Sequence, residues 1–206
     1  MREGITVLVG CNGLGKTTLI KNIRDELKKQ NIEAFSLKAN DRLNDDFISN
    51  FNKAMSSEGE GITIDVSRVI SDLREYIDTG IVPSKFPYLE SDKKESKSSE
   101  RWLLFDSIDS GYSIDNIIDF KTFLEEIMKD AKDKNLKLYI IIAANSYEFA
   151  NGQDCMDVST GKYLRFKSYE TYKKFILKTR DKKTKRIEKA KPKKLTQRAS
   201  RKLNRK

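Results

Sequence analysis

Short apolar runs alternate with stretches of helical periodicity along most of the chain. Mainly apolar segments at residues 5–9, 32–37, 102–105 and 138–144 predict strands, and the last is a continuous apolar run of the kind that a parallel sheet buries on both faces. Residues 157–158 and 162–166, on either side of Thr160 and Gly161, predict a terminal hairpin.

Helical spacing fills the segments between these runs. Residues 15–29 carry Leu19, Ile23 and Leu27 at i, i+4 and i+8, and residues 42–55, 62–77 and 115–131 also predict helices. Strands that alternate with helices indicate an α/β fold with a mainly parallel sheet and helices on both of its faces.

Two segments depart from this pattern. Residues 83–100 contain Pro83, Pro87 and many Ser, Lys and Glu residues, which indicates a polar insertion. Residues 173–206 contain few apolar side chains and cannot bury a core of their own. We therefore divide the chain into a domain at 1–172 and a basic tail at 173–206. A helix over 169–190 is expected to extend from the domain and to end before Pro192.

The charge of the chain is concentrated in this tail. The formal net charge is +10, but residues 173–206 hold 17 Lys or Arg and two acidic residues, so the rest of the chain sums to −5. Such a run predicts binding to nucleic-acid phosphates, with DNA expected over RNA; a solvated tail, or an anchor for another acidic partner, is the alternative. The candidate contacts are Lys182, Lys183, Lys185, Arg186, Lys193, Lys194, Arg198 and Arg201.

Composition excludes several kinds of chemistry. The chain has no His and only two Cys, which excludes Ser-His-Asp catalysis, His-ligated metals and a four-thiolate zinc site. The longest apolar run has seven residues, whereas a membrane helix needs about 20. Because no signal-peptide pattern is visible either, we expect a protein without membrane contact in the cytoplasm, which is the host cytoplasm if a phage encodes it.

The sharpest motif lies between the first predicted strand and the first predicted helix. Gly10-Cys11-Asn12-Gly13-Leu14-Gly15-Lys16-Thr17 fits G-x-x-x-x-G-K-[ST], the Walker A pattern of phosphate-binding loops, and Thr18 follows it. Glycines let the backbone approach a phosphate, and the helix N-terminus supplies free N–H groups. The Lys16 ammonium suits the β- and γ-phosphates, and the Thr17 hydroxyl suits Mg²⁺. The motif predicts a P-loop NTPase fold that binds ATP and Mg²⁺.

A second acidic element follows the strand at 102–105. Asp106 directly follows four bulky residues, so the strand delivers one carboxylate to the edge of the sheet where the nucleotide is expected. That placement suits a second Mg²⁺ ligand.

Three segments together resemble the ATP-binding-cassette (ABC) ATPases. The stretch from Asn12 to Leu19 resembles their N-G-x-G-K-[ST]-T-L motif, and residues 105–113 resemble their Walker B motif and D-loop. Ser57, Glu58, Gly59 and Glu60, before the helix at 62–77, resemble the ABC signature. The resemblance is greatest to compact heads of the SMC and recombination-repair class or to small phage-type relatives. It implies a head-to-tail dimer that sandwiches ATP, with the signature on the phosphate held by the other subunit.

The chain departs from that family at two catalytic positions. Ser107 stands where the family has a Glu after the Walker B Asp, and Asn145 stands where it has a switch His. Asp109 is the nearest carboxylate that could reach an attacking water. The candidate catalytic residues are Lys16, Asp106, Asp109 and Asn145. Because loss of a general base costs about 10²–10⁴ in rate, we expect slow hydrolysis.

Three functions remain open from the sequence. The first is an ABC-like ATPase that dimerises with ATP, hydrolyses it slowly and acts on nucleic acid through its tail. The second is a small P-loop kinase for nucleosides or nucleotides, although no Arg-rich lid is apparent. The third is a nucleotide-gated binding protein without significant turnover.

Overall fold

The computed structural model describes residues 1–38, 62–82, 98–109 and 114–203, and of residues 38, 62–70, 116 and 189–203 the backbone alone. The predicted helix at 42–55 lies outside these ranges. Insertion residues 83–97 lie outside them as well, and the last residue of the predicted insertion, Glu100, begins a strand.

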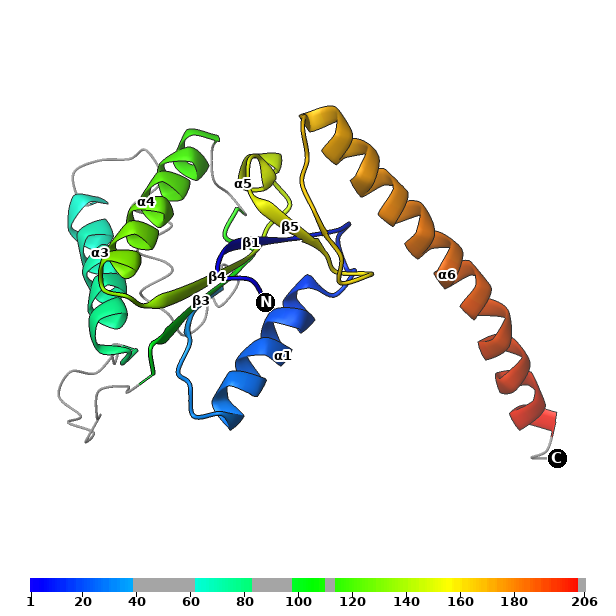
Figure 1. Cartoon of the computed structure of the whole chain (residues 1–206). Helices are drawn as coiled ribbons and strands as arrows, with labels where there is room; N and C mark the ends of the chain where they lie inside the picture. The colour runs from blue at the N-terminus through cyan, green and yellow to red at the C-terminus, as the bar shows by residue number, and fades with distance from the viewer. Residues whose placement is uncertain (39–61, 83–97, 110–113, 204–206) are drawn as a thin grey trace.

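A six-stranded sheet forms the centre of the molecule (Figure 1). Its order is β2-β3-β4-β1-β5-β6, and all neighbours are parallel except β5 and β6. The strands span Gly4–Val9 (β1), Phe35–Lys38 (β2), Glu100–Asp106 (β3), Lys137–Ala143 (β4), Asp154–Asp157 (β5) and Tyr163–Leu164 (β6). The predicted α/β fold with a mainly parallel sheet is confirmed, and the two last strands form the predicted hairpin.

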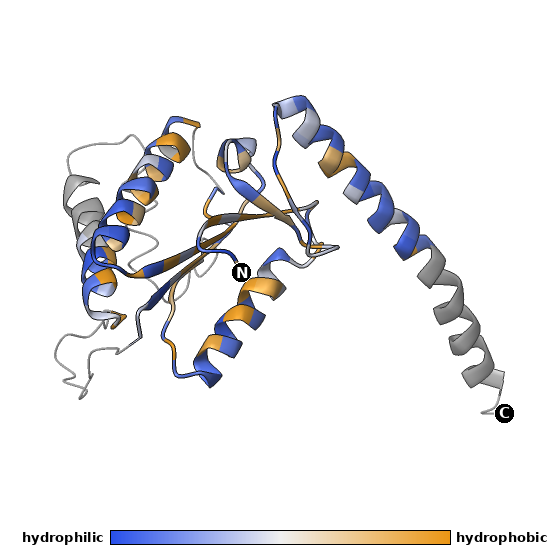
Figure 2. Ribbon diagram, viewed as in Figure 1, coloured by the Kyte–Doolittle hydropathy of each residue, from blue (hydrophilic) through white to orange (hydrophobic). Residues whose placement is uncertain are grey.

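Alternating side chains of the central strands enter two different cores. Val7, Phe105 and Ile142 pack into one cluster with α3 (Ile62–Thr79), α4 (Ile114–Asp133) and α5 (Tyr147–Ala150). Leu8, Leu104 and Ile141 point to the opposite face, where α1 (Lys16–Lys29) supplies the buried Ile20. Figure 2 shows that α1 and α4 are amphipathic, as helices that cover a sheet must be.

Parallel strands bring their carboxyl ends to the same edge of the sheet. The ends of β1, β3 and β4 lie side by side there, since β4 pairs with both β1 and β3. The segments after these strands begin with Gly10, Ser107 and Ala144. The topology therefore gathers the Walker A loop, Asp106 and Asn145 at one edge.

The last helix, α6, spans Tyr169–Leu203 (Figure 1). Ser168 precedes its first residue and caps it, since its Oγ accepts a hydrogen bond from the backbone N–H of Thr171 (3.3 Å). The prediction that Pro192 ends this helix is wrong, because α6 continues to Leu203. An interior proline costs about 3 kcal/mol, because it removes one N–H and its ring crowds the carbonyl of residue i−4, but the neighbouring Lys, Leu, Gln and Arg residues are strong helix formers. Within the described residues, no helix is both long and apolar enough to cross a membrane.

Candidate nucleotide-binding site

The loop between β1 and α1 has a backbone that only glycines adopt easily. Gly13 and Gly15 have φ angles of 73° and 105°. At Gly10, with φ 147°, a Cβ would lie 2.6 Å from Leu14 Cδ2. Gly15 is the N-cap of α1 and gives no side-chain cap, and the first turn carries no acidic residue. The N–H groups of this turn are therefore suited to bind an anion.

Lys16 joins this loop to the end of β4. Its Nζ donates hydrogen bonds to the carbonyl oxygen of Gly10 (2.7 Å) and to Oδ1 of Asn145 (2.8 Å). Burial lowers the pKa of Lys16, and the Asp109 carboxylate opposes that effect. An ammonium has three N–H donors, so these two bonds leave one for a phosphate oxygen.

Thr17 joins the loop to the end of β3. Its hydroxyl donates to Oδ1 of Asp106 (3.0 Å), a carboxylate that is 4% exposed. Mg²⁺ commonly takes one or two protein oxygens and completes its shell with water and substrate phosphates. The hydroxyl of Thr17 and the carboxylate of Asp106 are therefore the residues that would hold a magnesium ion.

Ser107 follows Asp106 in the left-handed backbone region, with φ 60°. Its N–H donates to the carbonyl oxygen of Ala143 (2.8 Å), and its hydroxyl donates to Oδ1 of Asp106 (3.3 Å). A left-handed serine costs about 1–3 kcal/mol and persists only where its surroundings hold it. Ser107 thus helps to hold the Asp106 carboxylate in place, but it has no carboxylate that could act as a general base.

Asp109 organises the loop that contains Asn145. Its Oδ2 accepts hydrogen bonds from the backbone N–H groups of Asn145 (2.6 Å) and Ser146 (2.7 Å). Its Oδ1 is buried and has no hydrogen-bond partner among the described residues. One oxygen of Asp109 is therefore structural, and the other is an unused acceptor beside Lys16 and Asn145.

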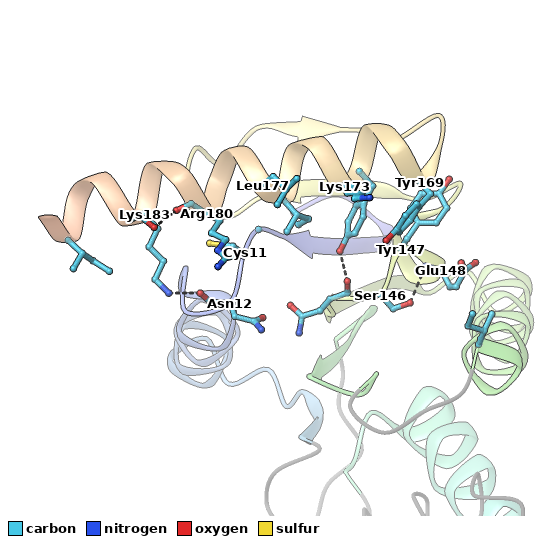
Figure 3. Close-up of a pocket in the computed structure, with 17 residues that line it drawn as sticks. Cys11, Asn12, Ser146, Tyr147, Glu148, Tyr169, Lys173, Leu177, Arg180 and Lys183 are labelled. Atoms are coloured by element: carbon cyan, nitrogen blue, oxygen red, sulfur yellow. Dashed lines mark hydrogen bonds between the residues drawn. The ribbon is translucent and has the colours of Figure 1, made fainter.

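The helix α6 lies on the phosphate-binding loop, a contact that sequence analysis missed. Oγ1 of Thr179 accepts from the backbone N–H of Cys11 (3.1 Å), and Nζ of Lys183 donates to the carbonyl oxygen of Asn12 (2.6 Å). Figure 3 shows Lys183 reaching from the helix to Asn12. Residues 172, 176, 179 and 183 recur at helical spacing on one face of α6, and this stripe is the sequence signal that could have revealed the contact.

An open cavity of about 860 Å³ lies between α6, this loop and the segment after β4. Its α6 wall includes Lys173, Arg180 and Lys183, and Tyr147 packs against Tyr169 at one end (Figure 3). The cavity adjoins Asn145, so it opens beside the predicted phosphate site.

The remaining predicted site residues differ in how they are exposed. Asn12 and Gly13 on the loop and Thr18 in the first turn of α1 are exposed, and Leu14 is half-buried. In the tail, Lys182, Lys185 and Arg186 are exposed, whereas Lys183 is half-buried against the loop. Outside the described residues or side chains lie Ser57, Glu58, Gly59, Glu60, Lys193, Lys194, Arg198 and Arg201. The division at residue 172 falls within α6, and residues on both sides of it, such as Tyr172 and Phe175, pack on the core.

The fold and the site define a P-loop NTPase. Comparison with protein families agrees: residues 1–142 match the AAA domain family, and the chain belongs to that family. It therefore carries a nucleotide-binding ATPase domain of the P-loop class. Searches of curated proteins and of solved structures found no match.

Proposed function

We propose that the chain binds ATP with Mg²⁺ at the edge formed by β1, β3 and β4 and hydrolyses it slowly. The observation that carries this proposal is the convergence of Lys16, Thr17, Asp106 and Asn145, joined in two hydrogen-bonded pairs across three strand ends. These residues lie far apart in the sequence. A glycine turn before a helix, which is a local feature, therefore does not explain why they meet.

Each of these residues has a role in phosphoryl transfer to water. The loop amides and the Lys16 ammonium bind the phosphates and offset their charge. Thr17 and Asp106 would hold Mg²⁺, which would supply positive charge against the charge that develops on the phosphate oxygens. Asn145 is positioned beside Lys16, where its amide group can donate to a terminal phosphate oxygen.

Slow turnover is supported by the surroundings of the candidate base. Ser107 cannot accept a proton at neutral pH without a partner base. Asp109 is the candidate that remains, and it has one unpartnered carboxylate oxygen among the described residues. That oxygen is buried and its partner oxygen is engaged with two backbone N–H groups, so its access to water is restricted.

A single-turnover assay with radiolabelled ATP tests this function. Wild-type protein in excess over ATP should release phosphate without any acceptor, and Asp109→Asn should slow that release by about 10²-fold or more if Asp109 is the base. Asp119→Asn, at an exposed position of α4, is the matched control. ATP that is bound but never hydrolysed would favour a nucleotide-gated binding protein.

The ABC-like features lead to a separate proposal about assembly. The segment that contains Ser57, Glu58, Gly59 and Glu60 would bind the phosphate of a second copy, so ATP would shift a monomer–dimer equilibrium. Ser57→Arg places bulk and charge at that contact. Light scattering should show a dimer with ATP in the wild type and a monomer in Ser57→Arg; a dimer in both would contradict this assignment.

The basic tail supports a role on nucleic acid, with DNA as the expected partner. Deleting residues 189–206 removes nine Lys or Arg residues and no acidic residue. It leaves Thr179 and Lys183 on the loop, so ATP binding should survive. Affinity for a DNA duplex should fall and become less dependent on salt. Unchanged DNA affinity would exclude the tail as the binding element.

One observation favours the kinase alternative. The cavity beside Asn145 has three cationic side chains on its α6 wall, and these would take the place of the Arg-rich lid that the sequence does not show. A second phosphate-bearing substrate would fit such a wall. A kinase would form ADP only when an acceptor nucleotide is added, so the acceptor-free assay above separates the two functions.

A further inference from the structure

Three side chains of α6 contact the two segments that we assign to phosphate binding. Thr179 and Lys183 bond the backbone of the Walker A loop at Cys11 and Asn12. Tyr172 donates its hydroxyl hydrogen to the carbonyl oxygen of Asn145 (2.6 Å). One helix thus touches both the loop that holds Lys16 and the residue that Lys16 contacts.

These contacts are buried and specific. Tyr172 and Thr179 are each 4% exposed. The Thr179 hydroxyl donates to the carbonyl oxygen of Ile176 (2.8 Å) while it accepts from Cys11, so both of its hydrogen-bonding functions are used. Burial, with the nearby Asp109 carboxylate, raises the pKa of Tyr172, so its hydroxyl keeps its proton and remains a donor.

A side chain of α6 also lies close to the loop at Gly13. A Cβ on Gly13 would lie 2.6 Å from Nζ of Lys183. The flexible Lys183 side chain can follow Asn12, but a change in the backbone at Cys11 on phosphate binding would either shift α6 or break the buried hydrogen bond to Thr179. Because packed elements have few alternative arrangements, such a change is passed to the helix rather than absorbed locally.

We propose that α6 is part of the nucleotide site, with Tyr172 and Thr179 as positioning residues that couple phosphate binding to the helix that carries the basic tail. This inference rests on the proposed ATP binding. Tyr172 holds Asn145 from its carbonyl side, and Thr179 fixes the start of the Walker A loop. Within the described part of the chain, neither side chain forms a hydrogen bond with Lys16, so each acts through a residue that it holds in place.

Thr179 and Thr184 offer a matched pair of substitutions. Thr179→Val removes the acceptor for the Cys11 N–H and keeps the shape of the side chain, and Thr179→Ser restores the hydroxyl. Thr184 lies further along α6, and its hydroxyl donates to the carbonyl oxygen of Arg180 (3.1 Å) in the same helix. We expect Thr179→Val to raise the Kd for ATP about fivefold, which corresponds to one ordinary hydrogen bond, and Thr179→Ser and Thr184→Val to stay near wild type.

Amide hydrogen exchange with and without ATP and Mg²⁺ tests the coupling, with ATP binding checked by calorimetry on each variant. In wild type and Thr184→Val, ATP should slow exchange in residues 172–183. In Thr179→Val this protection should be smaller, and in Thr179→Ser it should return to the wild-type level.

If Thr179→Val does not fold, Lys183→Gln replaces it, since it removes the cation from Asn12 at a half-buried position. ATP that binds in calorimetry but leaves exchange in α6 unchanged overturns the coupling. Absence of ATP binding in the wild type overturns the proposed function instead.

Discussion

Lys16 and Asn145 are joined by a hydrogen bond of 2.8 Å, although 129 residues separate them in the chain. The bond links the helix after β1 to the end of β4, the strand that pairs with β1. Asn145 is itself held from three sides, by Lys16, by Asp109 and by Tyr172. Such a fixed amide can act on a bound phosphate without reorganising.

We predict that Asn145→Ala lowers the rate of ATP hydrolysis by about 100-fold, the usual loss when one fixed donor to a developing charge is removed. The Kd for ATP should change much less, because Lys16 and the loop amides remain. Single-turnover rates and calorimetric Kd values measure the two effects separately. Asn22→Ala, at an exposed position of α1, is the control. A loss of ATP affinity with an unchanged single-turnover rate at saturating protein would show that Asn145 contributes to binding alone.

Asp106→Asn should weaken the dependence of ATP binding on Mg²⁺. The substitution keeps the shape of the side chain but removes the charge that suits a divalent cation. Titration of Mg²⁺ into protein with a fluorescent ATP analogue should show an apparent Mg²⁺ affinity at least about tenfold lower. Binding of the metal-free analogue should be preserved or improved. A Mg²⁺ titration identical to that of the wild type would remove Asp106 from the metal site.

The lowered pKa of Lys16 predicts a pH dependence of ATP binding. Burial disfavours the charged ammonium, and bound phosphates favour it, so binding raises this pKa again. The affinity for ATP should therefore have its full value at pH values below the lowered pKa of Lys16. It should fall as the pH rises through that pKa, before the ordinary lysine range is reached. Calorimetry from about pH 7 to about pH 10 measures the fall. Lys16→Arg should move it to higher pH, because arginine keeps its charge; a fall at the same pH in that variant would assign it to another group.

Tyr76 links the edge of the sheet to α3 and gives a prediction about stability. Its hydroxyl accepts from the N–H of Trp102 (3.0 Å) and donates to the carbonyl oxygen of Glu33 (2.8 Å), and its side chain is fully buried. Tyr76→Phe leaves these two backbone groups without their partner, which should lower the free energy of unfolding by about 1–3 kcal/mol. Urea denaturation measures the loss. Tyr169→Phe, at an exposed position, should change it by less than about 0.5 kcal/mol.

Much of the fold can be predicted from patterns that single segments carry. A continuous apolar run such as residues 138–144 indicates a buried strand, and the Walker A motif predicts a phosphate-binding loop and a helix directly after the first strand. Because the strands are parallel, Asp106 and Asn145 could be expected at the edge that holds Lys16. These predictions needed no knowledge of which strand pairs with which.

The position of α6 could not be read in the same way. The tail is rich in Lys and Arg, so its sequence predicts a charged segment in solvent or on nucleic acid. The contact of α6 with the loop depends instead on one narrow face of the helix, which includes Tyr172 and Thr179. A threonine on a charged helix is usually exposed, and only the tertiary structure shows that its hydroxyl meets the Cys11 N–H. The structural role of Asp109 could not be predicted for a similar reason. Its partners at Asn145 and Ser146 are backbone groups, which leave no mark in the sequence.

The most direct measurement is a calorimetric titration of the full chain with ATP and Mg²⁺, repeated on Lys16→Ala and on Lys28→Ala, an exposed lysine at the end of the same helix. We expect one ATP per chain to bind wild type and Lys28→Ala with equal affinity, and Lys16→Ala to lose most of that affinity. Undiminished binding to Lys16→Ala, or no binding to the wild type, would contradict a nucleotide site at the edge formed by β1, β3 and β4.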